Sequence, residues 1–326
     1  AASDVYKRQL VHIVHRLKLE LLKQRYLHID ETHVQVLKEP GRKNTSDSYM
    51  WVYCSIRDAV NPIRYFEYQP GRSGKYPEAF LRKYEGYIHT DAYSGYNAVS
   101  GVKRCLCYTH LRRAFVDALP KDIHNSEASK PAEAILRLNQ LFNIESELEA
   151  LPPDQKKKER LIREKPLLEA FWSWAEKSAI GELPKSKLSK AFHYALNNRE
   201  GFWNYLEDGN CSISNSLAEN CIRPFVIGRK NWLFSGSPKG AEASAGIYTL
   251  VETAKANGLA PMKYIKYILS DMPGSAFLEH PEYLDDYLPS GTSCPASDLL
   301  TESSFRIIKA RFSDSANTEI FLLMIQ

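Results

Sequence analysis

The sequence lacks any long hydrophobic run, and none approaches the roughly 18 consecutive apolar residues that a membrane-spanning helix needs. At its N-terminus it also lacks the apolar core and small-residue cleavage site of a secretory signal. Its six cysteines among 326 residues are too few for a disulfide scaffold. These absences exclude a disulfide-rich secreted domain and a membrane span, and we expect a cytosolic protein with reduced cysteines.

Several catalytic signatures are missing as well. The sequence has no G-x-x-x-x-G-K-[ST] phosphate loop, no G-x-G-x-x-G after a strand and no H-E-x-x-H helix. No motif singles out one of the 19 tyrosines as a recombinase nucleophile. What is present is an ordinary globular composition, 44% hydrophobic and 25% charged, which excludes a wholly disordered chain.

The formal net charge of +4 hides an uneven distribution of charge. Residues 271–326 carry nine acidic and three basic side chains, so that residues 1–270 carry a net +10. A basic body fits a polyanionic partner such as a nucleic acid. Charge alone leaves open an ordinary lysine-rich surface.

Alternating and aromatic-rich segments predict a small sheet in the first part of the chain. We expect strands over 26–37, 47–57, 63–68, 86–90 and 102–108. We expect helices over 10–25, over 77–84 and from residue 109. The expected order is three strands, a helix, two strands and a helix, which is the order of a ribonuclease H-like fold. This fold belongs to the α/β class, and its core is an α+β mixed sheet with helices on its faces. Many two-layer folds share parts of this order.

The remainder of the chain predicts helices. A helix over 216–223 should end at Pro224, and further helices are expected over 240–257 and 261–270. We set residues 1–9 aside as a leader of foreign origin. We expect a leader with the end of a helical region over 1–25 and a first part of the core over 26–128. An all-helical insertion over 129–205 and a second part of the core over 206–258 should follow. A C-terminal helix over 259–272 and an acidic, poorly ordered tail over 273–326 complete the chain.

Three acidic residues stand where a metal-dependent active site would need them. Asp30 lies inside an apolar strand pattern, where a carboxylate is costly unless it is paired or binds a metal. Asp91 follows a strand, and Glu219 lies on the short helix. In a ribonuclease H-like sheet the first and fourth strands are neighbours, so the two aspartates would meet. Carboxylates that converge repel one another and favour Mg²⁺ or Mn²⁺, and two such ions can activate a nucleophile at a phosphodiester.

Each acid also has a structural alternative. A one-residue shift in register would turn Asp30 toward solvent, and Asp91 could be a turn or cap residue. Ser216 and Glu219 match the S-x-x-E capping box, in which the glutamate only binds backbone N–H groups. With 39 acidic residues in the chain, spacing by itself decides nothing.

Around these acids the chain closely resembles transposases of the insertion sequence 66 family. The matching blocks include YLHIDETHVQVL, GYIHTDAYSGYN, CYTHLRRAF and the long block that begins NSLAENCIRPF at residue 215, and the resemblance covers roughly 26–270. It implies a DDE-type transposase in which Asp30, Asp91 and Glu219 hold Mg²⁺ or Mn²⁺, with two ions expected. It implies hydrolysis at transposon ends and strand transfer into target DNA.

The resemblance also implies partners and location. We expect a homo-oligomer on paired DNA ends, accessory proteins of the same element, and a bacterial cytoplasmic protein that associates with the nucleoid on DNA. Family members are longer at the N-terminus, so we expect a truncated copy. Another ribonuclease H-like nuclease and a non-catalytic DNA-binding remnant are the alternatives.

Basic side chains near the motifs are the candidates for DNA contact, because phosphates bind Arg and Lys and aromatics can stack on unpaired bases. The candidates are Lys103, Arg104, His110, Arg112, Arg113, Arg223, Arg229, Lys230, Trp232 and Lys239. For Trp232 a place in the core is the alternative. Cys107 and His110 form a C-x-x-H pair, a weak zinc signal because a structural site needs four ligands. We expect Cys107 in a core strand.

Overall fold

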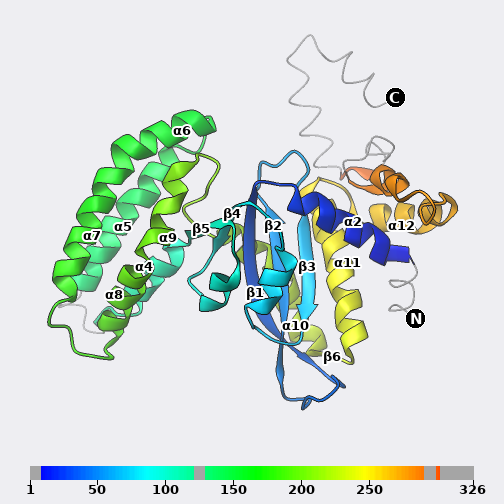
Figure 1. Ribbon diagram of the computed structural model, residues 1–326, viewed down its shortest axis with the longest axis horizontal. Coiled ribbons are helices and arrows are strands. Elements are labelled where there is room, and N and C mark those ends of the chain that lie inside the picture. The colour runs from blue at the N-terminus through cyan, green and yellow to red at the C-terminus, as the bar shows by residue number, and fades with distance from the viewer. Residues whose placement is uncertain (1–8, 121–128, 290–298, 302–326) are drawn as a thin grey trace, which may run out of the picture. The chain divides into compact units, whose positions relative to one another are not determined.

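The computed structural model describes residues 9–120, 129–289 and 299–301 (Figure 1). Its sheet runs in the order β3-β2-β1-β4-β5, and β6 pairs with β1. β2 and β3 are antiparallel, whereas β4 and β6 run parallel to β1 and β5 runs parallel to β4. The strands are β1 (Tyr26–Val36), β2 (Asp47–Ser55), β3 (Arg64–Gln69), β4 (Gly86–Thr90), β5 (Val102–Leu106) and β6 (Phe234–Ser235).

This mixed sheet confirms the expected ribonuclease H-like α+β class, and each of the five expected strands is present. Several boundaries differ by one to four residues, and two of them matter here. The helix α3 (Lys75–Phe80) begins two residues before Pro77, and β5 ends at Leu106. Cys107 therefore lies outside the strand, as the residue before the helix α4 (Tyr108–Val116), although it is buried as expected.

The chain forms two compact units that share β1. One unit comprises residues 1–24, 31–72 and 220–326, within the described ranges. In it, α11 (Pro238–Ala256) packs against the edge strand β3. The hydroxyl of Thr249 accepts a 2.9 Å hydrogen bond from the backbone N–H of Phe66, and that of Thr253 accepts one of 3.0 Å from Arg64. These bonds satisfy strand N–H groups that would otherwise be buried without a partner.

The second unit comprises residues 25–30 and 73–219 and contains the expected helical insertion. Figure 1 shows α5, α7 and α8 side by side with α4. Their core is aromatic: Phe115 of α4 lies edge-on to Phe171 and Phe192. The insertion consists of α5 (Lys130–Glu147), α6 (Pro153–Glu159), the π-helix η4 (Arg160–Glu164), α7 (Lys165–Ala179), α8 (Lys187–Asn197) and α9 (Arg199–Trp203).

The helix α10 corrects one prediction. It extends over Ser216–Trp232 with Pro224 inside it, so the expectation that the helix ends at Pro224 is wrong. A proline inside a helix removes one N–H donor and strains the preceding turn. The buried side chains of Ile222 and Phe225, on either side of Pro224, anchor the helix through this position.

The C-terminal region corrects part of the prediction of a poorly ordered tail over 273–326. The helix α12 (Pro261–Asp271) is present as expected, but residues 273–289 are ordered as well. They include the short helices η6 (Met272–Gly274) and η7 (Pro281–Tyr287). Arg16 of α2 (Val11–Leu22) donates two hydrogen bonds to Asp285, at 2.5 and 3.0 Å. Residues 302–326 of the predicted tail, and residues 1–8 of the predicted leader, lie outside the described residues. Among the described helices, none is long and apolar enough to cross a membrane.

Candidate active site

The pairing of β1 with β4 determines the relation between the two predicted aspartates. The strands are parallel, and His28 pairs with His89. Two residues beyond this pair, in the same direction on both strands, stand Asp30 and Asp91. Parallel strands carry equivalent residues side by side, so this register places Asp30, inside β1, beside Asp91, directly after β4, and both side chains are half-buried.

The loop that carries Asp91 is held by hydrogen bonds. The Asp91 carboxylate accepts a 3.0 Å bond from the backbone N–H of Tyr93. The guanidinium of Arg104, on β5, donates to the backbone carbonyls of Asp91 at 2.6 Å and Tyr93 at 2.9 Å. It also donates to Thr90 Oγ1 at 2.8 Å and to Asn97 Oδ1 at 2.7 Å. Arg104 is a predicted DNA contact, but in the structure its guanidinium N–H groups donate hydrogen bonds to the residues around Asp91.

A second loop, residues 208–215, leads into α10 and is bound to the sheet. The backbone N–H of Ser212 donates to His89 Nε2 at 2.9 Å. The buried side chain of Asn215 donates to the carbonyl of Ile29 at 2.7 Å and bonds His28 Nδ1 at 3.0 Å. Because Ile29 directly precedes Asp30, Asn215 ties the start of α10 to the strand that carries this aspartate.

Glu219 lies in the first turn of α10, and its backbone N–H donates to the carbonyl of Asn215 at 3.3 Å. Its side chain is 27% exposed. One carboxylate oxygen, Oε1, is buried and has no hydrogen-bond partner among the described residues. A capping-box glutamate would bind a backbone N–H there, so this geometry does not support the capping alternative. Glu219, Asp30 and Asp91 all belong to the second unit.

Two ionisable side chains of α4 lie near Glu219. His110 Nδ1 lies 3.6 Å from Glu219 Oε1, and Arg113 lies 3.9 Å from Oε2. The donor atoms of Cys107, His110 and Glu219 all lie within 4.8 Å of one another. Burial raises the pKa of the Cys107 thiol, against backbone N–H groups of Asn215 and His110 that lower it. In the absence of a bound cation, this thiol is protonated at neutral pH.

A second group of possible metal ligands is fully buried below the site: His89, Cys105 and Cys211. His89 already bonds the carbonyl of Leu27 through Nδ1 and the N–H of Ser212 through Nε2, so its ring nitrogens have protein partners. A hydrogen bond from Cys105 lowers the pKa of Cys211 to about 6 in spite of burial. Asp30 and Asp91 belong to neither of these groups, as far as the described residues go.

The other predicted DNA contacts divide into engaged and exposed side chains. Arg112 donates to Asn139 at 2.7 Å, Lys103 pairs with Glu207, and Arg229 bonds Thr32 at 3.2 Å and the carbonyl of His33. Trp232 is half-buried, with its ring 5.2 Å from that of Phe225. The exposed candidates are Lys103, Arg113, Arg223, Lys230 and Lys239, of which Lys103 and Arg113 also lie beside a glutamate.

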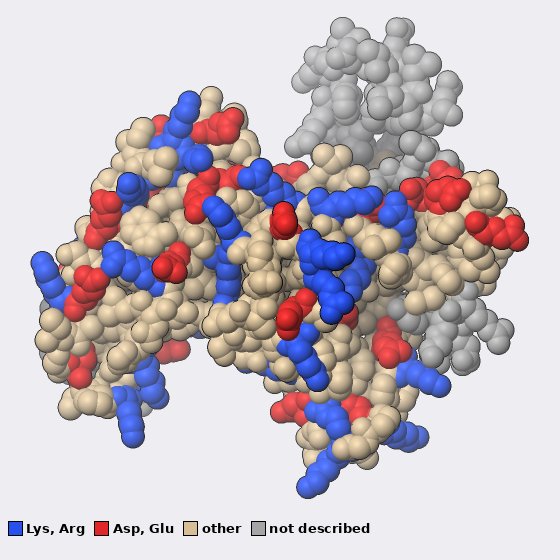
Figure 2. Space-filling model, in the orientation of Figure 1, with Lys and Arg blue, Asp and Glu red and all other residues tan. Residues whose placement is uncertain are grey.

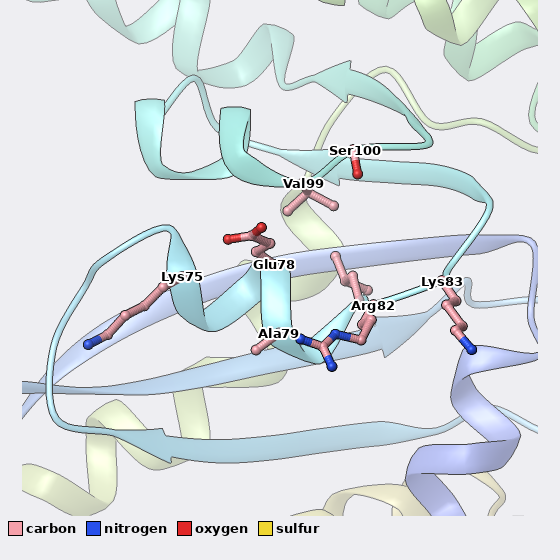
Figure 3. A pocket seen from close by; sticks show the side chains of 8 residues that line it. Lys75, Glu78, Ala79, Arg82, Lys83, Val99 and Ser100 are labelled. Carbon is pink, nitrogen blue, oxygen red and sulfur yellow. The ribbon is translucent and has the colours of Figure 1, made fainter.

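The described surface carries other features besides this site. Figure 2 shows basic and acidic side chains interspersed on the face in view. A pocket of about 290 Å³ lies in the second unit, where Val99 and Ser100 face Ala79 and Arg82 (Figure 3). None of the predicted site residues lines it. Its lining residues are Lys75, Glu78, Ala79, Leu81, Arg82, Lys83, Val99 and Ser100.

Comparison with known proteins decides the family. The family model described as "Transposase IS66 family" matches residues 3–243, well over half of the chain. The chain belongs to the IS66 transposase family. For this IS66 chain the match begins at residue 3, within the opening segment 1–9 that was expected to be a foreign leader.

Curated relatives of the IS66 chain come from Sinorhizobium fredii (strain NBRC 101917 / NGR234). The uncharacterized protein y4hP is 27% identical over 75% of this chain and 47% of its own length. The uncharacterized protein y4qI is 29% identical over 74% of this chain and 46% of its own length. The chain thus spans about half the length of the curated relatives it matches. No solved structure matches the chain.

The local sequence did not show the hydrogen-bond partners of two residues near the site. Asn215 begins the strongest matching block, but nothing in its local pattern shows that it bonds a strand 186 residues away. Arg104 lies in a basic stretch, and the same stretch predicts phosphate contact as readily as internal hydrogen bonding. Only the hydrogen-bond partners separate these two roles.

Proposed function

We propose that this IS66 family chain carries the catalytic centre of a DNA transposase, which cleaves DNA strands at transposon ends and transfers them to target DNA. Asp30, Asp91 and Glu219 are its catalytic carboxylates. The observation that carries the proposal is the parallel register of β1 and β4, which aligns Asp30 with Asp91. Asn215 supports it, because this residue joins β1 to the turn of α10 that carries Glu219.

The three side chains fit the divalent ions that transposases of this type use. All three offer only oxygen donors, which suit Mg²⁺ and Mn²⁺, and all three are half-buried, so DNA can approach them. Bound there, a pair of such ions would activate a water or a 3′-hydroxyl and stabilise the leaving oxygen.

The remaining residues position these groups. Arg104 holds the loop of Asp91 through two backbone carbonyls. Arg113, 55% exposed and 3.9 Å from Glu219, is the candidate for a contact to the phosphate beside the reacting one. Residues 26–128 and 206–258 would form the catalytic core, interrupted by the helical insertion 129–205.

The proposed partners follow from the same assignment. They are the transposon ends and target DNA, a second copy of the chain on paired ends, and accessory proteins of the same element. Such a protein would work in the bacterial cytoplasm and associate with the nucleoid while bound to DNA.

The test is Mg²⁺- or Mn²⁺-dependent nicking of DNA by the purified chain at low salt, where phosphate contacts are strongest. Asp91→Asn and Glu219→Gln should each lower the rate at least about a hundredfold, because each removes a ligand charge. Asp117→Asn, an exposed acid at the end of α4, is the matched control and should nick like the wild type.

Equal nicking by all four proteins would show contamination or a different active site. DNA binding without nicking by the wild type would favour a non-catalytic DNA-binding remnant. Nicking without strand transfer of paired transposon ends would favour another ribonuclease H-like nuclease.

A further inference from the structure

The first turns of α4 and α10 carry two polar side chains, His110 and Glu219, that lie close to each other. His110 Nδ1 and Glu219 Oε1 are both buried, and neither has a hydrogen-bond partner among the described residues. They stand 3.6 Å apart, which is too far for a hydrogen bond. Two buried polar atoms that face each other in this way carry a desolvation cost unless something lies between them.

A third donor completes the arrangement. The buried Sγ of Cys107 lies, with these two atoms, in a group whose members are all within 4.8 Å of one another. The backbone N–H of Asn215 donates to this sulfur at 3.1 Å. Outer hydrogen bonds of this kind orient metal ligands and are typical of metal sites.

The separation of His110 from Glu219 can be compared with that of two ligands of one metal ion. With metal–ligand bonds of about 2.0–2.3 Å in a tetrahedral site, neighbouring donor atoms stand roughly 3.3–3.8 Å apart. The 3.6 Å between His110 and Glu219 lies within this range, and Cys107 Sγ is within 4.8 Å of a donor atom of each.

We propose that Cys107, His110 and Glu219 bind a zinc-type divalent cation, with a fourth position open to solvent. A mixed set of sulfur, nitrogen and oxygen donors selects zinc-type ions over Mg²⁺. Three protein ligands with an open fourth position are the arrangement of reactive zinc sites, whereas structural sites have four protein ligands. The 27% exposure of both His110 and Glu219 provides the opening.

This site is separate from the pair Asp30 and Asp91 and shares only Glu219 with the proposed catalytic centre. A cation there would cross-link α4 to α10 and hold Glu219 in place. The C-x-x-H spacing puts Cys107 and His110 on one helical turn, and the tertiary fold supplies the third ligand from 109 residues further along the chain.

The test uses Co²⁺ as a spectroscopic probe on the full chain after chelation and dialysis. We expect a thiolate-to-cobalt charge-transfer absorption that saturates near one equivalent, disappears on addition of Zn²⁺ and persists in excess Mg²⁺. Cys107→Ser should abolish this absorption. Glu219→Gln, which keeps the size of the side chain, should weaken Co²⁺ binding by about tenfold or more while the thiolate band remains.

Two control variants make the result decisive. Cys211→Ser removes a ligand from the other buried group and should leave the absorption unchanged; its loss in this variant would assign the ion to His89, Cys105 and Cys211 and overturn the proposal. Asp91→Asn should also retain the absorption, so a failure of the nicking assay and a failure of this site are distinguishable. A folded wild-type chain without any thiolate band would overturn the proposal.

Discussion

Arg104 illustrates how much a single side chain depends on its setting. The sequence places it among four basic residues and no acidic one over 102–113, which favours DNA contact. In the structure its guanidinium donates four hydrogen bonds, at 2.6–2.9 Å, to the last residue of β4 and to the segment that follows, and it lies over the ring of Tyr96. These partners indicate that Arg104 positions Asp91.

Replacing this side chain should therefore cost stability as well as activity. Arg104→Ala leaves the carbonyls of Asp91 and Tyr93 without their donor, and we expect the free energy of unfolding to fall by about 1–3 kcal/mol. Denaturant titration measures the change, with Arg223→Ala, an exposed base on α10, as the control. An equal effect of both variants on DNA affinity, with no change in stability, would contradict the positioning role.

Glu164 shows the same dependence on buried partners. Burial raises its pKa to about 8, and the neighbouring charge of Glu145 adds to this. Arg160 bonds Glu145 through two donors, at 2.5 and 2.8 Å. Although burial opposes its ionisation, these bonds lower the pKa of Glu145. Arg160 therefore compensates the charge of Glu145, and Glu164 remains protonated at neutral pH.

The pH dependence follows from the sign of this shift. A carboxyl whose pKa is higher in the folded than in the unfolded chain stabilises the fold below about 4.5 and loses that contribution as the pH rises toward about 8. Glu164→Gln, which stays neutral, should match the wild type at pH 5 and exceed its unfolding free energy by about 1 kcal/mol or more at pH 8.5. The exposed Glu147→Gln is the control, and parallel pH profiles of Glu164→Gln and the wild type would refute the assignment.

At the scale of elements, α10 joins the site to the rest of the chain. Its first turn carries Glu219, and Pro224 lies one turn further along. A local reading of the proline ends the helix there, because proline has no N–H for the carbonyl four residues earlier. The apolar side chains on both sides of Pro224 are buried, and tertiary packing of this kind outweighs a local preference.

Pro224 inside α10 still lowers the stability of the fold, and a substitution can restore it. Pro224→Ala restores the missing donor to the carbonyl of Asn220, and we expect the unfolding free energy to rise by about 1–3 kcal/mol. Pro261→Ala, at the first position of α12, should change stability little because the first N–H of a helix has no intrahelical partner. Thermal or denaturant unfolding compares the two, and a loss of stability in Pro224→Ala would show that α10 needs the bend.

At the scale of the whole molecule, the helical insertion shares a core with the sheet. Tyr87 of β4 and Leu106 of β5 belong to the same buried cluster as Phe171 and Trp172 of α7. The insertion is therefore part of the unit that carries the three carboxylates, and it is not an appended module.

The proposed binding to DNA should depend on the overall charge of the molecule. The net +10 of residues 1–270 predicts binding that weakens steeply as salt rises. Lys230→Ala, exposed on α10, should lower the slope of log affinity against log salt by about 1, as expected for one lost phosphate contact. Lys157→Ala, exposed on α6, should leave the slope unchanged. Identical slopes for Lys230→Ala and the wild type would remove Lys230 from the interface.

The sequence by itself determined the strands, most of the helices, the family and the three candidate carboxylates. Hydrophobic period, turn residues and the long matching block are local signals, and each can be read within about forty residues. The tertiary structure alone decided which side chains meet. Asn215 bonds Ile29, Arg104 bonds the Asp91 loop, and Glu219 faces Cys107 and His110. These contacts join segments distant in the chain, and no local pattern encodes a partner that only folding brings near.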